Sequence, residues 1–292
     1  MKIQGTILAA TALGRVSDEA VRQAHDIAKA TGNGVAVVHV LPELVGRRPL
    51  FPELRMLDRE QAVRTEDIAR TAMRDQWTRV VSTEPLDANL SLESGTPHSG
   101  VLQRADDIGA GMIVVGSGSR ASGTSLGGVA ERIVRHAHCP VLAASAPRDG
   151  PVIAATDFSD PALPAIRWGA AEAKRRGVKF AILHAIELYV TPVEFPEGIF
   201  SQVPLMLIEA RREEAHERLA QLEAEFQPSA GVLLRTGPAE VAIVEAAEQL
   251  DADLVVVGTH GRTGLRRLAL GSVAEGVVRH ARCSVLVVRL TN

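Results

Sequence analysis

Short apolar runs alternate with longer amphipathic segments through the second half of the chain. The apolar runs are rich in β-branched residues, which is typical of buried strands, whereas the segments between them repeat apolar positions at helical spacing. The predicted strands are 152–156, 179–186, 232–235, 254–257 and 285–288, and the predicted helices are 161–176, about 205–226, 239–250 and 273–281. This alternation requires crossover connections and predicts a doubly wound α/β domain with a five-stranded parallel sheet.

The first half of the chain repeats the same pattern. Residues 127–145 and residues 271–289 are identical at 11 of 19 positions at a constant offset of 144. Such self-similarity indicates a tandem duplication. A segment rich in Pro and Gly separates the copies at residues 146–151, and is suited to a linker. We therefore predict two tandem domains, residues 1–146 and residues 151–292.

Composition and charge exclude several classes of function. The net charge is −3 and aromatic residues make up 3% of the chain, so neither a phosphate-backbone surface nor a base-stacking platform is expected, and nucleic acid is not a predicted partner. No apolar run reaches the roughly 20 residues of a membrane helix. The two cysteines are too few for a disulfide framework. We expect a cytoplasmic protein without a membrane partner.

Candidate binding residues follow the first and fourth predicted strands of the second copy. Ligands of open parallel sheets bind beyond the carboxyl ends of the strands, where the strand order reverses, and in a five-stranded unit of this type that point lies between these two strands. Thr156 and Asp157 follow the first strand. Asp157 is either an acceptor for a nucleoside hydroxyl or amine, or a cap of the following helix.

A glycine-rich segment, residues 258–272, follows the fourth strand. Gly258 and Gly261 let the main chain approach a ligand closely. Gly271 and Ser272 precede a helix, whose free amide groups favour an anion, and Ser272 either caps this helix or donates its hydroxyl to a phosphate. Arg262 follows Gly261 directly and supplies positive charge. The segment predicts a phosphate site.

The spacing of Gly258, Gly261, Gly271 and Ser272 resembles the G-x2-G-x9-G-[S/T] pattern of ATP-binding universal stress proteins, and the resemblance covers nearly the whole chain in the tandem form of that family. It implies a Rossmann-like fold similar to adenine nucleotide alpha hydrolases. It also implies a protein that binds ATP, with or without Mg²⁺, in its second domain and acts as a nucleotide-dependent sensor or regulator in a stress response. Its protein partner is not identified by the sequence. The implied site residues are Thr156, Asp157, Ala185, Val257, Gly258, Gly261, Arg262, Gly271, Ser272 and Val273.

The first copy departs from this pattern. Ala12 stands where the second copy has Asp157, Ser119 replaces the second glycine, and Gly128 replaces the serine. The loop is also two residues shorter than in the second copy. We therefore expect one competent nucleotide site in the chain. Residues 116–121 fit a dinucleotide-binding fingerprint, but they follow a fourth strand rather than a first, which disfavours NAD.

The sequence offers no candidate catalytic residue and no convincing metal site. No nucleophile, base and acid occur at a plausible spacing, and His39 and His184 at equivalent strand ends are predicted to be structural. We expect a regulator with at most slow ATP hydrolysis, and keep two alternatives: a slow adenine-nucleotide hydrolase or transferase, and a structural interaction module without a ligand. The apolar last strands, 141–144 and 285–288, need partners at their edges. An intramolecular pseudo-dimer satisfies this need, and a further homodimer stays open.

Overall fold

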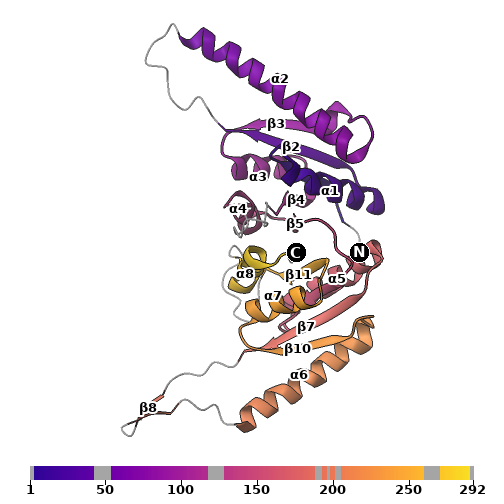
Figure 1. Ribbon diagram of the computed structural model, residues 1–292, viewed down its shortest axis with the longest axis vertical. Coiled ribbons are helices and arrows are strands. Elements are labelled where there is room, and N and C mark those ends of the chain that lie inside the picture. Colours follow the sequence, from indigo (N-terminus) through magenta and orange to yellow (C-terminus); the bar gives the residue numbers. More distant parts are fainter. Residues whose placement is uncertain are drawn as a thin grey trace. The chain divides into compact units, whose positions relative to one another are not determined.

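The computed structural model describes residues 3–42, 54–117, 128–187, 193–195, 198–200, 205–259 and 270–289. The chain divides into two compact units, Lys2–Ala146 (domain 1) and Pro147–Leu290 (domain 2). Each unit is an α/β domain whose strands and helices alternate along the chain (Figure 1). Among the described helices, none has the length and apolar character needed to span a membrane.

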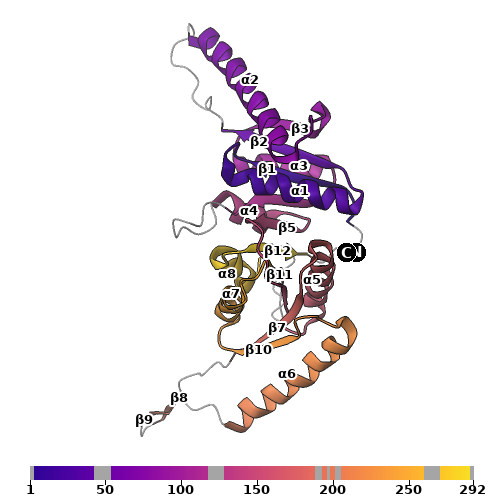
Figure 2. The same ribbon diagram turned by 45° about the vertical axis from the view of Figure 1, so that its right-hand side comes forward.

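Domain 1 contains a parallel sheet with the strand order β3-β2-β1-β4-β5. Its strands are β1 (Thr6–Thr11), β2 (Val35–Leu41), β3 (Leu90–Ser94), β4 (Ala110–Gly116) and β5 (Val141–Ala144). Its helices are α1 (Asp18–Thr31), α2 (Leu54–Val81), α3 (Pro97–Asp107) and α4 (Gly128–His136). Figure 2 shows that α2 crosses beside β3 and β2, and that α1 lies against β1.

Domain 2 repeats this sheet in the strand order β10-β7-β6-β11-β12. Its strands are β6 (Val152–Ala155), β7 (Phe180–Ile186), β10 (Val232–Thr236), β11 (Leu254–Gly258) and β12 (Ser284–Val288). Its helices are α5 (Leu163–Arg176), α6 (Leu205–Phe226), α7 (Ala239–Gln249) and α8 (Ser272–His280). The strand order reverses between β6 and β11. The structure therefore confirms the predicted fold, two tandem doubly wound domains with parallel sheets.

The local sequence explains why these elements form and where they end. The central strands are buried on both faces, as expected for parallel strands covered by helices. Helix α5 approaches the sheet closely because Gly169 has no side chain, and a Cβ there would lie 2.9 Å from the Cβ of Ala154. Helices α1 and α5 end at Gly32 and Gly177, whose φ angles of 72° and 71° are in the left-handed region that favours glycine.

One part of domain 2 differs from the prediction. No strand is predicted between residues 186 and 205, but the structure has two short antiparallel strands there, β8 (Val193–Phe195) and β9 (Gly198–Phe200). Each strand has three residues, which is too short for a strand pattern to be recognised in the sequence. The sequence pattern therefore carried no signal for this hairpin.

Candidate functional site

A pocket of about 540 Å³ lies at the carboxyl ends of β6, β7 and β11 in domain 2. Its walls come from the turn after β6, the last residues of β7 and β11, the start of α7, the start of α8, and one face of α6. This is the place where the strand order reverses, and such a volume is typical of small-molecule sites.

Eight of the ten predicted site residues line this pocket. They are Thr156, Asp157, Ala185, Val257, Gly258, Gly271, Ser272 and Val273. The other two, Gly261 and Arg262, lie outside the described residues. Residues that are up to 117 positions apart in the sequence, from Thr156 to Val273, thus meet around one cavity.

The turn after β6 holds the carboxylate of Asp157 in a defined orientation. The main-chain N–H of Ser159 donates to Asp157 Oδ1 over 3.0 Å, and the Ser159 hydroxyl donates to the same oxygen over 2.6 Å. Ser159 itself occupies the N-cap position of the short 3-10 helix Asp160–Ala162 that precedes α5. The carboxylate is therefore bonded within the turn and does not occupy the helix cap, which was the alternative prediction for Asp157.

Main-chain geometry directs Ala185 toward the pocket. Strand β6 pairs with β7 only as far as Ala155 opposite Leu183, and Thr156 N–H then donates to the Leu183 carbonyl over 2.9 Å. Alternate residues of a strand present their N–H and C=O groups to the same side. Ala185 lies two residues beyond Leu183, so its main-chain N–H and C=O groups face the same side of β7. Strand β6 has already ended at this level, and Ala185 lines the cavity there.

An aromatic stack forms another wall. His184 is 8% exposed, and its Nδ1 lies 2.8 Å from the Thr156 carbonyl oxygen. Because a carbonyl only accepts, Nδ1 carries the hydrogen. The Phe158 ring lies over His184 with centroids 4.0 Å apart, and the Arg218 guanidinium of α6 lies 5.8 Å from the Phe158 centroid. His39 of domain 1 makes the equivalent bond, 2.8 Å to Thr11 O. Both histidines thus make the same main-chain contact at the end of the first strand of their domain, as expected of a structural role.

The start of α8 supplies amide groups to the pocket. Gly271 is the N-cap residue and Ser272 is the first helical residue, so the alternative that Ser272 caps the helix is wrong. Gly271 N–H donates to the Thr259 carbonyl over 2.8 Å, which brings the two ends of the glycine-rich segment together. The first amide groups of a helix have no acceptor within it and attract anions.

Sequence reasoning missed several lining residues. Arg211 and Glu214 reach the pocket from α6, and Glu187 reaches it from the end of β7. Glu187 Oε1 accepts the N–H of Ala239 over 2.8 Å and so joins the end of β7 to the start of α7. The sequence analysis had assigned residues 205–226 only to a helix and none of its charges to the site. No local signal distinguishes the charges that face the pocket, because the placement of α6 over the sheet edge is a tertiary property.

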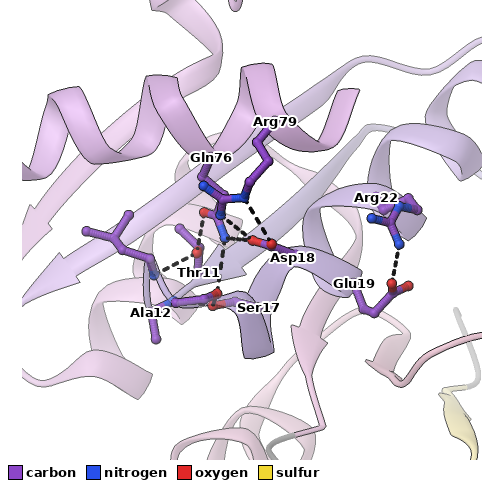
Figure 3. A network of polar contacts seen from close by, with 10 residues as sticks. Thr11, Ala12, Ser17, Asp18, Glu19, Arg22, Gln76 and Arg79 are labelled. Atoms are coloured by element: carbon purple, nitrogen blue, oxygen red, sulfur yellow. Dashed lines mark hydrogen bonds and ion pairs between the residues drawn. The ribbon is translucent and has the colours of Figure 1, made fainter. Parts of the chain in front are cut away.

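The corresponding turn of domain 1 has a different set of contacts (Figure 3). Thr11 Oγ1 donates to Gln76 Oε1 over 2.6 Å, and Gln76 Nε2 donates to Asp18 Oδ1 over 2.8 Å. Arg79 also donates to Asp18, over 2.8 Å and 3.2 Å. Burial acts to raise the pKa of Asp18, but the hydrogen bonds from Arg79 and Gln76 outweigh it and lower this pKa. These bonds tie α2 to the end of β1, where Ala12 offers no carboxylate.

The described residues contain no group of three or more His, Cys, Asp and Glu side chains with an arrangement suited to a metal ion. The carboxylates that line the pocket among them are Asp157, Glu187 and Glu214. Mg²⁺ usually binds through one or two carboxylates together with substrate phosphates. The pocket is therefore compatible with a metal that arrives on a phosphate chain.

Comparisons with known proteins agree with the geometry. The sequence profile of the Universal stress protein family matches the chain twice, over residues 5–145 and 150–289. Universal stress protein Rv2005c of Mycobacterium tuberculosis is 31% identical over 270 residues, which cover 87% of this chain and 87% of that protein. Universal stress protein MJ0531 of Methanocaldococcus jannaschii is 35% identical over 140 residues, 47% of this chain and 81% of that protein.

Solved structures share the fold over almost the full length. The crystal structure of a universal stress protein from Archaeoglobus fulgidus has a TM-score of 0.66 at 18% identity, and covers 97% of this chain and 98% of that one. The crystal structure of the functionally unknown protein PA1789 from Pseudomonas aeruginosa has a TM-score of 0.64 at 20% identity. The match covers 97% of this chain and 92% of that one. At these identities the likeness concerns the fold.

Proposed function

The chain belongs to the universal stress protein family, and we propose that its second domain binds ATP and that the bound nucleotide regulates association with a protein partner. The observation that carries the proposal is the pocket at the switch point of domain 2, which gathers the eight described residues of the predicted site. In domain 1, the equivalent turn has no carboxylate and is bonded to α2 instead. We therefore propose one nucleotide per chain.

Different groups that line the pocket suit the base, the nucleoside and the phosphates of a nucleotide. The main chain of Ala185 and the end of β7 offer hydrogen-bonding groups for an adenine edge. Asp157 offers a fixed carboxylate for a nucleoside hydroxyl or amine. The first amides of α8, beginning at Ser272, provide a site for phosphate. Mg²⁺ would neutralise part of the phosphate charge when it is bound with ATP.

The described carboxylates of the pocket favour binding over catalysis. Asp157 accepts two hydrogen bonds from Ser159, and Glu187 accepts one from Ala239. Glu214 pairs with Arg218 over 3.2 Å. These contacts hold the carboxylates in place, and the acceptor positions that remain can serve a nucleoside hydroxyl or amine. The sequence offers no nucleophile, base and acid at a catalytic spacing. We therefore propose a regulator whose hydrolysis of ATP is slow.

Isothermal titration calorimetry with ATP, ADP, AMP, cAMP and GTP tests the binding directly. We expect one ATP site per chain, and a loss of about tenfold or more in affinity for Asp157→Ala, since a hydrogen bond to a charged group is typically worth about 1.5–3 kcal/mol. Asp26→Ala is a matched control, because Asp26 is an exposed aspartate on α1 of domain 1. Equal binding by Asp157→Ala and the wild type would contradict the proposed site.

Thermal unfolding gives a second measurement. ATP at a hundredfold excess over Kd should stabilise the protein by about 2.7 kcal/mol, which raises Tm by roughly 5–10 °C for a domain of this size. If the purified protein carries no nucleotide and ATP does not raise its Tm, the structural-module alternative is favoured. Single-turnover ATP cleavage far above background, lost in Asp157→Ala, would favour the enzyme alternative.

The cellular setting is part of the same proposal. We propose a cytoplasmic protein, supported by the two cysteines of the sequence, which are too few for a disulfide framework. Fractionation of cells that express the tagged chain tests the location. Nucleotide-dependent capture under different stresses, with wild type and Asp157→Ala compared, tests the regulatory role.

A further inference from the structure

We propose that Ser159 is a positioning residue, which fixes the carboxylate of Asp157 for the nucleotide without touching the nucleotide itself. The inference rests on the proposed function, because it assigns a role within the same site. Asp157 and its neighbours Thr156 and Phe158 line the pocket, whereas Ser159 does not. Any effect of Ser159 on binding should therefore pass through Asp157.

The hydrogen bonds of Ser159 are committed to Asp157. Its hydroxyl donates over 2.6 Å and its main-chain N–H over 3.0 Å, and both reach the same oxygen, Oδ1. A bond of this length to a carboxylate is typical of charge-assisted pairs. Together the two donors fix the rotation of the Asp157 side chain before a ligand arrives.

Ser159 lies at a helix N-cap, where a serine side chain usually bonds the helix and not a neighbouring carboxylate. Serine at an N-cap usually accepts a hydrogen bond from an amide of the first helical turn. Ser159 is the N-cap of the 3-10 helix Asp160–Ala162, yet its side chain makes no capping bond. The hydroxyl is directed to Asp157 instead, so its contribution to the helix is minor.

Domain 1 shows that the turn itself does not require this pair. Phe158 and Leu13 have φ angles of 65° and 64°, in the left-handed region that is uncommon outside glycine. In both domains the N–H of this residue donates to the preceding threonine hydroxyl, over 3.0 Å to Thr156 and 2.9 Å to Thr11.

Domain 1 keeps this turn although the two positions of the pair hold other residues. Ala12 and Gly14 stand where domain 2 has Asp157 and Ser159. The carboxylate and the hydroxyl are thus both present in domain 2, whose pocket is described above, and both absent from the equivalent positions of domain 1. Since the turn forms without them, the pair serves the pocket.

A double-mutant cycle separates positioning from a direct or structural role. ATP affinity is measured by calorimetry for the wild type, Ser159→Ala, Asp157→Ala and the double variant. We expect Ser159→Ala to raise Kd about tenfold, because Asp157 must then be ordered on binding. In the Asp157→Ala background the same change should leave Kd unaltered, and Ser159→Thr, which keeps the hydroxyl, should bind within about threefold of the wild type.

Matched measurements make the outcomes distinct. Ser17→Ala removes a buried hydroxyl from the corresponding turn of domain 1, where Ser17 accepts from Ala12 N–H over 3.1 Å, and it should leave ATP affinity unchanged. Circular dichroism of the free variants reports whether Ser159→Ala is folded.

Two results would overturn the inference while the proposed function stands. The first is an unchanged Kd for Ser159→Ala, and the second is a loss of the same size in both backgrounds, which would show that Ser159 acts independently of Asp157. A wild-type chain that binds no ATP would refute the proposed function and this inference with it.

Discussion

Removal of the Arg176 side chain should strongly destabilise domain 2. Arg176 ends α5, and its guanidinium lies between two buried acids: Nε is 3.1 Å from Glu172 Oε2, and Nη1 is 2.6 Å from Asp253 Oδ2. The side chains of Arg176, Glu172 and Asp253 are 8%, 7% and 3% exposed. The substitution Arg176→Met keeps most of the aliphatic length and removes the charge.

The size of the destabilisation depends on the partners that Glu172 and Asp253 keep in the variant. Glu172 keeps Arg175 as a partner, at 2.7 Å, and Asp253 keeps the main-chain N–H of Arg148, at 2.8 Å. Both carboxylates nevertheless lose a charged partner in a buried setting. Breaking one partner of a buried ion pair typically costs about 3–5 kcal/mol, and we expect Arg176→Met to cost about 3 kcal/mol because some partners remain.

The loss of stability caused by Arg176→Met should depend on pH. Burial acts to raise the pKa of Glu172, but hydrogen bonds and charge from Arg175 and Arg176 outweigh it and hold this pKa below its ordinary value. A depressed carboxyl pKa contributes stability that is present above the unfolded pKa and is lost as the pH falls through the folded one. Arg176→Met removes part of this contribution. The difference between variant and wild type should therefore be largest near pH 7 and shrink below about pH 4.

The two tryptophans allow each domain to be followed separately. Trp168 is 8% exposed in α5 of domain 2, and Trp77 is 5% exposed in α2 of domain 1. Urea unfolding of a Trp77→Phe background reports domain 2 through Trp168. Arg74→Met is the matched control in a Trp168→Phe background, because Arg74 pairs with Asp87 on the surface of domain 1, where such pairs contribute about 0–1 kcal/mol. A loss below 1 kcal/mol for Arg176→Met at pH 7, or a loss that is constant with pH, would refute this reasoning.

Two further predictions concern domain 1 and use Trp77 fluorescence. Gln76→Leu leaves Thr11 and Asp18 without the amide that joins them, and should cost about 1–3 kcal/mol in urea unfolding; an unchanged midpoint would show that this buried network does not stabilise the domain. His98 has a pKa below its ordinary value because of burial and the nearby charges of Arg132 and His136, so the folded state resists its protonation and stability falls as the pH drops below about 6.5. His98→Gln, which does not titrate, should reduce that fall by a few tenths of a kcal/mol, since the side chain is only partly buried, and an identical pH profile for variant and wild type would contradict this interpretation.

The sequence predicted the fold well, because strand and helix patterns are local, and the described residues of the predicted site line one pocket. Strand and helix limits in domain 2 differ from the prediction by at most a few residues, for example a helix that begins at Leu163 after a 3-10 turn and not at residue 161. Thr156 and Gly258 could be placed at one edge because the carboxyl ends of parallel strands meet there.

The remaining features depend on contacts that no local pattern specifies. The Phe158 ring stacks on His184 from a left-handed residue that is not glycine, and such a conformation is difficult to predict from side-chain type. Arg211 and Glu214 line the pocket because α6 crosses the ends of the strands. Glu187 bonds the start of α7 from 52 positions away. Each of these contacts results from packing between elements rather than from their individual sequences.

The two copies show how one scaffold supports different roles at the same edge. Helices α2 and α6 both lie, along the chain, between the second and third strands of the sheet in their domain. Gln76 bonds the threonine at the end of the first strand, whereas Arg218 packs on Phe158 in the wall of the pocket. In domain 1 the helix therefore secures the strand end through buried hydrogen bonds. In domain 2 the equivalent helix forms a pocket wall, and the carboxylate of Asp157 is held by its own turn, which leaves the edge of the sheet available to a ligand.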